Sequence, residues 1–276
     1  MTIELSGNAE QGRNQYQGFP GRVIDTMPVL IEQGYIPASV RTVIDRRISG
    51  PEEVRQAWNN QYFFTGDLAS TDNTGIAVLT LDAPELRGIT PESKLYNGAL
   101  VLTADQLNAI ENSDASITLT PSQVGDAHCK GFTKRNGIWQ PENTAVATAL
   151  NHYLRGQSFD DQDFQTYAQG VSDASHGSQR IFTQYFDQSK PRKPHGRSVV
   201  VVRTDYNSYV SSDDGLSGYD GFFVGVAPEA PVARENGVKS PSRRDVVNAL
   251  YQHIEGVPVT KGVTKKGLEA VLRQFL

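Results

Sequence analysis

Two apolar segments in the second half of the chain restrict its fold more than any other feature. Residues 199–202 read Val-Val-Val-Val, and residues 221–227 read Gly-Phe-Phe-Val-Gly-Val-Ala. A strand that is apolar on both faces belongs inside a sheet that is covered on both sides. Residues 205–220, which lie between the segments, have no helical period, and parallel neighbours need a long crossover. We therefore expect the two strands to pair antiparallel, in a sheet that is not doubly wound.

Three groups of short amphipathic helices are expected around this sheet, over residues 26–62, 141–187 and 239–276. The residues that mark the expected helix starts are Thr26, Pro37, Ser49, Asn143, Ser158 and Ser242. Ser49 with Glu52 has the spacing of a capping box, a side-chain arrangement that satisfies the first free N–H groups of a helix. Residues 178–187 are expected to be helical because Ile181, Phe182, Tyr185 and Phe186 share one helical face.

Short strands are expected between the first two helical groups. Residues 76–81, 99–102 and 116–120 are apolar or alternate in polarity. Asn97-Gly98 and Asn136-Gly137 are dipeptides that readily take the positive φ angles of tight hairpin turns. The pattern as a whole predicts an α+β fold with a mixed or antiparallel sheet and three blocks of short amphipathic helices.

We expect one structural unit over residues 1–276, because no linker is long enough to require two. A helical C-terminal subdomain over 239–276 and a boundary near 188–197, where the sequence is basic and interrupted by proline, are the alternatives.

One cysteine, Cys129, excludes an internal disulfide and favours a reducing compartment. The first residues lack the basic and apolar regions of a signal peptide, and apolar runs fall far short of the roughly 18 residues of a membrane helix. We expect a cytoplasmic protein that does not bind membranes.

The loop over residues 205–220 is the first candidate site. It carries four carboxylates that could act in catalysis or bind a cation, at Asp205, Asp213, Asp214 and Asp220, with tyrosines nearby. Long irregular loops between core strands are often functional. The spacing fails the EF-hand pattern because no glycine occupies the sixth position, and the loop glycines precede a strand rather than a helix. A solvated surface loop is the alternative interpretation.

The histidines supply the other candidate groups. His176 comes first, because it lies where the 178–187 helix is expected to start and could meet an anion there; His195 is the second possible proton carrier. His128-Cys129 is an isolated pair without the further ligands of a zinc site. His176, Asp205, Asp214 and Asp220 are therefore the candidate catalytic residues, and we expect no cofactor and no metal.

Two basic segments could contact phosphate groups. The first contains Lys190, Arg192, Lys193 and Arg197, and the second is the pair of helices expected over 239–276. The net charge of −5 gives no general attraction to nucleic acid, and the connection between the two helices is too long for a helix-turn-helix. Nucleic-acid binding through the C-terminal helices is therefore possible but not favoured.

The leading functional hypothesis is a non-catalytic binding or structural module, because no nucleophile–base pair, metal cluster or cofactor loop can be assembled from the spacing. The main alternative is a small-molecule hydrolase or transferase whose site forms around the 205–220 loop and a histidine. The sequence does not indicate a substrate, a partner or an oligomeric state.

Overall fold

The computed structural model describes residues 15–49, 51–156, 158–159, 161–175, 181–187, 193–204, 209–218 and 222–228. These residues lie in one compact unit, Met1–Pro228. The helices are α1 Val23–Glu32, α2 Val40–Ile48, α3 Glu52–Asn59, α4 Pro84–Arg87, α5 Ala104–Glu111, α6 Pro121–Ala127, α7 Thr144–Tyr153 and α8 Gln162–Ala174. The strands are β1 Tyr16–Pro20, β2 Ile36–Pro37, β3 Phe63–Thr71, β4 Ala77–Thr80, β5 Leu95–Tyr96, β6 Ala99–Val101, β7 Ser116–Leu119, β8 Lys130–Arg135, β9 Ile138–Pro141, β10 Ile181–Tyr185, β11 His195–Val201, β12 Tyr209–Ser211 and β13 Phe222–Val226.

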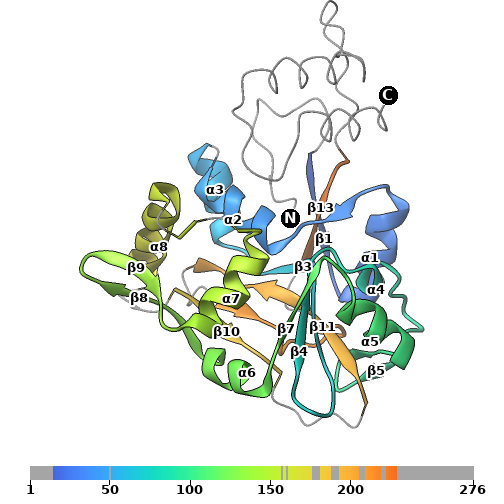
Figure 1. The fold of residues 1–276 in the computed structure, drawn as a ribbon. Coiled ribbons are helices and arrows are strands. Elements are labelled where there is room, and N and C mark those ends of the chain that lie inside the picture. Colours follow the sequence, from blue (N-terminus) through green and yellow to red (C-terminus); the bar gives the residue numbers. More distant parts are fainter. Residues whose placement is uncertain are drawn as a thin grey trace, which may run out of the picture. The chain divides into compact units, whose positions relative to one another are not determined.

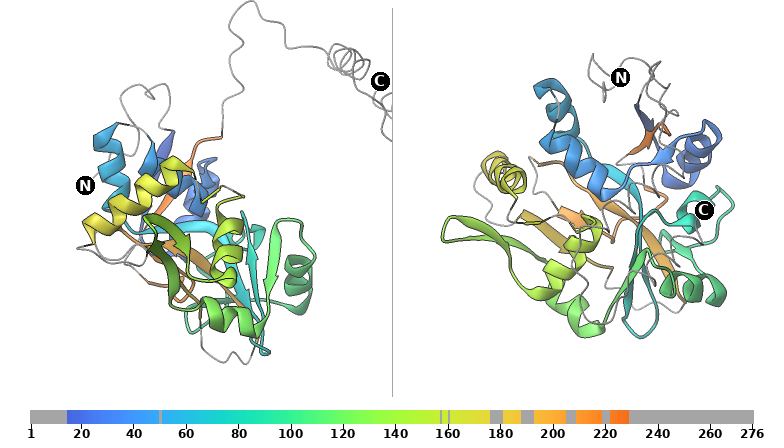
Figure 2. Two further views of the ribbon diagram at one scale, coloured as in Figure 1. Left: turned by 60° about the vertical axis from the view of Figure 1, so that its left-hand side comes forward. Right: turned by 45° about the horizontal axis from the view of Figure 1, so that its top comes forward.

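One mixed sheet organises this unit. Its main strand order is β1-β13-β3-β11-β12-β10-β8-β9, with β4 and β7 continuing from β3 and with β5 and β6 attached to β11. β13 is parallel to β3 and β10 is parallel to β12, whereas the other pairs are antiparallel. The β8–β9 hairpin ends the sheet and extends outward in the right-hand view of Figure 2. The expected α+β architecture with a mixed sheet is confirmed.

Strand β11 is the centre of the core, as its run of valines predicts. Val199 and Val201 pack in one hydrophobic cluster, with residues of α2, α3, α7 and α8. Val200 and Val202 pack in a second cluster, with residues of α1, α4 and α5. Successive strand side chains point to opposite faces, so the four valines serve both clusters, and burying each contributes about 1.5–3 kcal/mol. Figure 1 shows α2, α3, α7 and α8 on one side of the sheet and α1, α4 and α5 on the other.

The expected pairing of the two apolar strands is wrong. β3 lies between them, antiparallel to β11 and parallel to β13. The connection after β11 first forms β12, which takes the other edge of β11. The chain thus returns to the sheet on the far side of β3, and a local pairing rule could not indicate that.

The expected helix over 178–187 is also wrong, because residues 181–185 form β10. This strand pairs with β12 on one side and β8 on the other. Phe182 is buried, with its ring stacked 5.8 Å from that of Phe164 on α8. Pairing on both edges and aromatic packing therefore override the helical spacing of the apolar residues. The second helical block loses this helix, and the third, over 239–276, lies outside the described residues.

Several helix ends differ from their predicted residues. α1 begins after Arg22, and the Thr26 hydroxyl donates to the Arg22 carbonyl inside the helix. Pro37 belongs to β2, and Ser39 caps α2 instead. Ser49 ends α2 by donating to the Asp45 carbonyl, so it does not cap α3. Ser158 is likewise displaced by Asp161 as the cap of α8, whereas Asn143 caps α7 as expected. No helix in the described ranges has the length and apolar character needed to cross a membrane.

A buried carboxylate joins β3 to its neighbours. Asp67 is fully enclosed, and its two oxygens accept from the backbone N–H of Val40, at 2.7 Å, and of Asp82, at 3.0 Å. Val40 is the first residue of α2, so Asp67 satisfies a helix N–H that has no partner within the helix. Burial raises the pKa of Asp67 to about 6, although both backbone donors act in the opposite direction.

Candidate functional site

The register of three strands brings one set of loops together at the start of β11. Ser211 on β12 is opposite both Val200 on β11 and Tyr185 on β10. Because β10 and β12 are parallel, the residues that follow them leave the sheet side by side. Because β11 is antiparallel to β12, those residues pass the first residues of β11, which include His195 and Arg197. The sheet therefore places Asp187, which follows β10, and the 212–218 loop beside this end of β11.

Arg197 holds the loops at this end of the sheet. Its Nε donates to Asp187 Oδ2 at 2.9 Å, its Nη2 to the carbonyl of Asn97 at 2.8 Å, and its Nη1 to the carbonyl of Asp214 at 3.1 Å. The side chain is 6% exposed. We call Arg197 and these three acceptors the Arg197 hub. One planar guanidinium thus fixes the β5–β6 turn, the segment after β10 and the loop after β12, because its donors diverge in fixed directions.

His195 is attached to the same hub but is not connected as a catalytic base. Its Nε2 lies 2.7 Å from Asp187 Oδ2 and 3.4 Å from the hydroxyl of Thr71, while its Nδ1 lies 3.4 Å from the carbonyl of Lys193. In a catalytic triad the carboxylate and the nucleophile bind opposite nitrogens of the imidazole. Here the carboxylate and the hydroxyl share one nitrogen, and the ring is almost completely buried. This geometry suits a structural histidine.

Tyrosines and carboxylates lie close together on β10, on β12, and on the residues just before β3 and just after β12. The Tyr185 and Tyr209 rings meet edge to face, with centroids 5.0 Å apart. Burial and a hydrogen bond to Asp214 raise the pKa of Tyr62, with a smaller contribution from nearby Tyr209. Burial and the neighbouring Asp214 raise the pKa of Asp213, and Arg197 partly offsets this. We call Tyr62, Tyr185, Tyr209, Asp213 and Asp214 the tyrosine–aspartate face. Asp213 is exposed and the other four are half-buried.

The structure places the predicted site residues only in part. Asp214 joins the Arg197 hub through its carbonyl and Tyr62 through its side chain. His176, Asp205 and Asp220 lie outside the described residues. His195, the second proton carrier considered, does meet the loop, through Arg197 and Asp187. Within the described ranges, no group of three or more His, Cys, Asp or Glu side chains is placed to hold a metal ion.

The His128-Cys129 pair has a local structural role. His128 Nδ1 accepts from the backbone N–H of Phe186 at 3.2 Å, and the backbone N–H of Cys129 donates to the Gln184 carbonyl at 2.8 Å. Cys129 has a φ of 57°, in the left-handed region that side chains other than glycine rarely adopt. The pair therefore attaches the start of β8 to β10.

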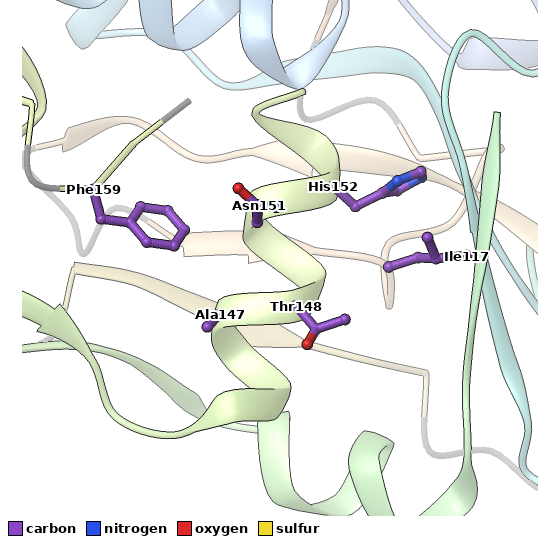
Figure 3. A pocket seen from close by; sticks show the side chains of 6 residues that line it. All are labelled: Ile117, Ala147, Thr148, Asn151, His152 and Phe159. Carbon is purple, nitrogen blue, oxygen red and sulfur yellow. The ribbon is translucent and has the colours of Figure 1, made fainter. Parts of the chain in front are cut away.

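A hollow of about 380 Å³ lies beside α7 and is lined by Ile117, Ala147, Thr148, Asn151, His152 and Phe159. Figure 3 shows Ile117 on one flank of the helix and Phe159 on the other, with His152 pointing towards Ile117. Burial lowers the pKa of His152. The hollow is open to solvent rather than enclosed. None of the predicted site residues lines it, so we assign the hollow no function.

Sequence reasoning missed the residues that organise the site. Arg197 was grouped with a basic segment that could contact phosphate, whereas its guanidinium is buried against Asp187 and two carbonyls. One signal was present in the sequence: Arg197 stands two residues before the four valines, so a strand that is buried from its first residue would also bury Arg197. The sequence contains no comparable signal for Asp187 or Tyr62.

Comparison with known proteins gives one structural likeness. No family model matches the chain, and no curated protein matches it. A solved structure described as "Accommodation of massive sequence variation in Nanoarchaeota by the C-type lectin fold" aligns with a TM-score of 0.53. The alignment covers 78% of this chain and 99% of that chain, at 18% sequence identity. The chain has a C-type lectin fold. At this identity, the likeness shows the fold alone.

The β5–β6 turn provides a test of how tightly the loops of this C-type lectin fold are packed. Gly98 has a φ of +78°, and an added Cβ would lie 2.9 Å from Gly215 Cα. Gly137, in the equivalent Asn-Gly turn of the β8–β9 hairpin, has a φ of +82° but no atom within 4 Å of an added Cβ. Gly98→Ala is therefore expected to lower the free energy of unfolding more than Gly137→Ala, which costs about 1–2 kcal/mol for the left-handed backbone alone. Urea denaturation of both variants measures the difference, and equal losses would contradict the close packing.

Proposed function

We propose that the chain is a non-catalytic binding module that contacts its partner through the tyrosine–aspartate face. The observation that carries the proposal is the contiguity of this face: Tyr62 contacts Asp214 and lies near Tyr209, which contacts Tyr185. Half-buried tyrosines supply a large contact area at a low cost in conformational entropy, and they are enriched at binding surfaces.

The layer beneath the face supports binding rather than catalysis. The Arg197 hub fixes the loops beneath the face, and its histidine, His195, is buried and bound to Asp187. The neighbouring structure is described as accommodating massive sequence variation with the same fold. We propose that in this chain, too, the fold serves as a support for a binding face.

The partner should carry positive charge and a flat apolar group. Asp213 and Asp214 make the face acidic, and tyrosine rings offer both stacking surfaces and sites for cations. We therefore propose a protein partner that presents arginine or lysine, and its binding should weaken as salt screens the carboxylates.

The test is selection of a phage-displayed peptide library on the full chain. We expect selected peptides to be rich in arginine or lysine, to bind less tightly to Tyr209→Ala and Asp214→Asn by about tenfold or more, and to be recovered chemically unchanged. Ile138→Ser, at an exposed residue of the β8–β9 hairpin, is the control and should bind as the unchanged chain does. Two results would overturn the proposal. One is conversion of a bound peptide to a new product; the other is selection of peptides that bind to both face variants as tightly as to the unchanged chain.

A further inference from the structure

A groove on the side of the sheet covered by α2, α3, α7 and α8 contains a buried arginine that forms no ion pair with any described residue. The groove has a volume of about 410 Å³ and lies between α2, α3 and α8. Its charged and polar lining includes Arg47, Glu52, Arg55, Asn59 and Asp163. None of these residues belongs to the tyrosine–aspartate face, so the groove is a separate feature of the molecule.

Arg47 lies in the wall of the groove and is only 2% exposed. Its Nε donates to the carbonyl of Trp58 at 3.0 Å, its Nη2 to the carbonyl of Gln61 at 3.1 Å, and its Nη1 to the hydroxyl of Tyr167 at 3.3 Å. These contacts satisfy carbonyls at the end of α3, which is a sufficient structural reason for an arginine here. All three acceptors are neutral, however, and no carboxylate among the described residues forms an ion pair with Arg47. A guanidinium also has five N–H groups, and three are used.

Other groups in the groove complement an ammonium ion. The side-chain oxygen of Asn59 is buried and has no hydrogen-bond partner within the described structure. Glu52 and Asp163 are exposed acidic residues that line the same groove. A buried cation, an unpaired acceptor and two exterior carboxylates are therefore arranged around one opening.

We propose that this groove binds a small zwitterion of the α-amino acid class. The carboxylate of the ligand would pair with the remaining N–H groups of Arg47, since a guanidinium matches the planar geometry of a carboxylate. Its ammonium group would face Asn59 and the acidic residues. Arg47 and Arg55 balance Glu52 and Asp163 in this lining, so a ligand with one group of each charge fits better than a phosphate dianion. The proposal is independent of the proposed partner of the tyrosine–aspartate face.

A substitution that fills the groove gives the sharpest test. Gly170 lines the groove on α8, and an added Cβ there would meet no atom within 4 Å. Gly170→Leu should keep the fold, because leucine favours a helix interior more than glycine does. Gly125 on α6 is also exposed, also has no atom near an added Cβ, and does not line the groove, so Gly125→Leu is the matched control. Arg47→Lys keeps the charge but removes the planar donor pair.

The measurement is ligand-detected NMR of the full chain with mixtures of the common α-amino acids, followed by calorimetric titration of each amino acid that binds. We expect at least one amino acid to bind to the unchanged chain and to Gly125→Leu, to lose its signal with Gly170→Leu, and to bind about tenfold or more weakly to Arg47→Lys. The matching carboxylic acid without its amino group should bind more weakly. The proposal is overturned if no amino acid binds, if binding survives Gly170→Leu, or if inorganic phosphate binds in preference.

Discussion

Replacing Arg197 with alanine is expected to lower the free energy of unfolding by about 3–5 kcal/mol, which is the usual cost of removing one partner from a buried ion pair. The variant removes the guanidinium from the Asp187 carboxylate, and it removes the donors from the carbonyls of Asn97 and Asp214. Each of the three segments then loses its bond to the Arg197 side chain. Urea denaturation, followed by circular dichroism, measures the change.

Two further variants distinguish the loss of the hub's hydrogen bonds from the general effect of removing an arginine on the free energy of unfolding. Arg197→Lys should fall between the unchanged chain and the alanine variant, because one ammonium cannot reach three diverging acceptors. Arg135→Ala, at an exposed arginine on β8, should change the free energy of unfolding by no more than about 0.5 kcal/mol. A loss below about 1 kcal/mol for Arg197→Ala would show that the loops do not depend on the hub.

The second large effect is a dependence of stability on pH through Asp67. Its pKa is raised from 3.8 to about 6 in the folded chain, mainly by burial. The folded state therefore binds the proton more tightly than the unfolded state does. The contribution of Asp67 to stability is highest when the carboxyl is protonated, and it falls as the pH rises from about 4 to about 6. The rise in the pKa of Asp67 from 3.8 to about 6 corresponds to a full contribution of about 3 kcal/mol to the free energy of unfolding.

The amide variant Asp67→Asn isolates this contribution, because its side chain stays neutral at every pH. We expect the unchanged chain to gain about 2.4 kcal/mol relative to Asp67→Asn when the pH is lowered from about 7 to about 4. Other groups titrate in both proteins and largely cancel in the difference. NMR titration of the Asp67 carboxyl carbon should show a midpoint near 6. A difference that does not change with pH, or a midpoint below about 4, would contradict the prediction.

Local sequence signals predicted those elements whose structure is decided locally. Asn97-Gly98 forms the β5–β6 turn with both φ angles positive, and Asn136-Gly137 does the same in the β8–β9 hairpin. Thr103 and Gln106, which have the spacing of a capping box in the sequence, form one at the start of α5. In each case a few neighbouring residues determine the backbone, so that reading them in order is sufficient.

The incorrect predictions concern segments whose structure is determined by residues that are distant in the sequence. Residues 181–185 have helical spacing, yet β8 and β12 supply hydrogen-bond partners on both edges and make them a strand. The same limit applies to the site. Asp214 was a candidate because carboxylates cluster in its loop, but Asp187 and Arg197 become neighbours only through the register of β10, β11 and β12. That register depends on packing over the whole sheet.

The position of Arg197 on β11 has a consequence for how the loops move. Its strand continues into the valines that belong to both hydrophobic clusters, so β11 can leave the sheet only when both clusters open together. The amides of such a strand exchange with solvent on the time scale of global unfolding, whereas ordinary loops open far more often. Loops that are bonded to Arg197 share the stiffness of that strand. A partner would therefore meet a surface that is already ordered, and association would lose little conformational entropy.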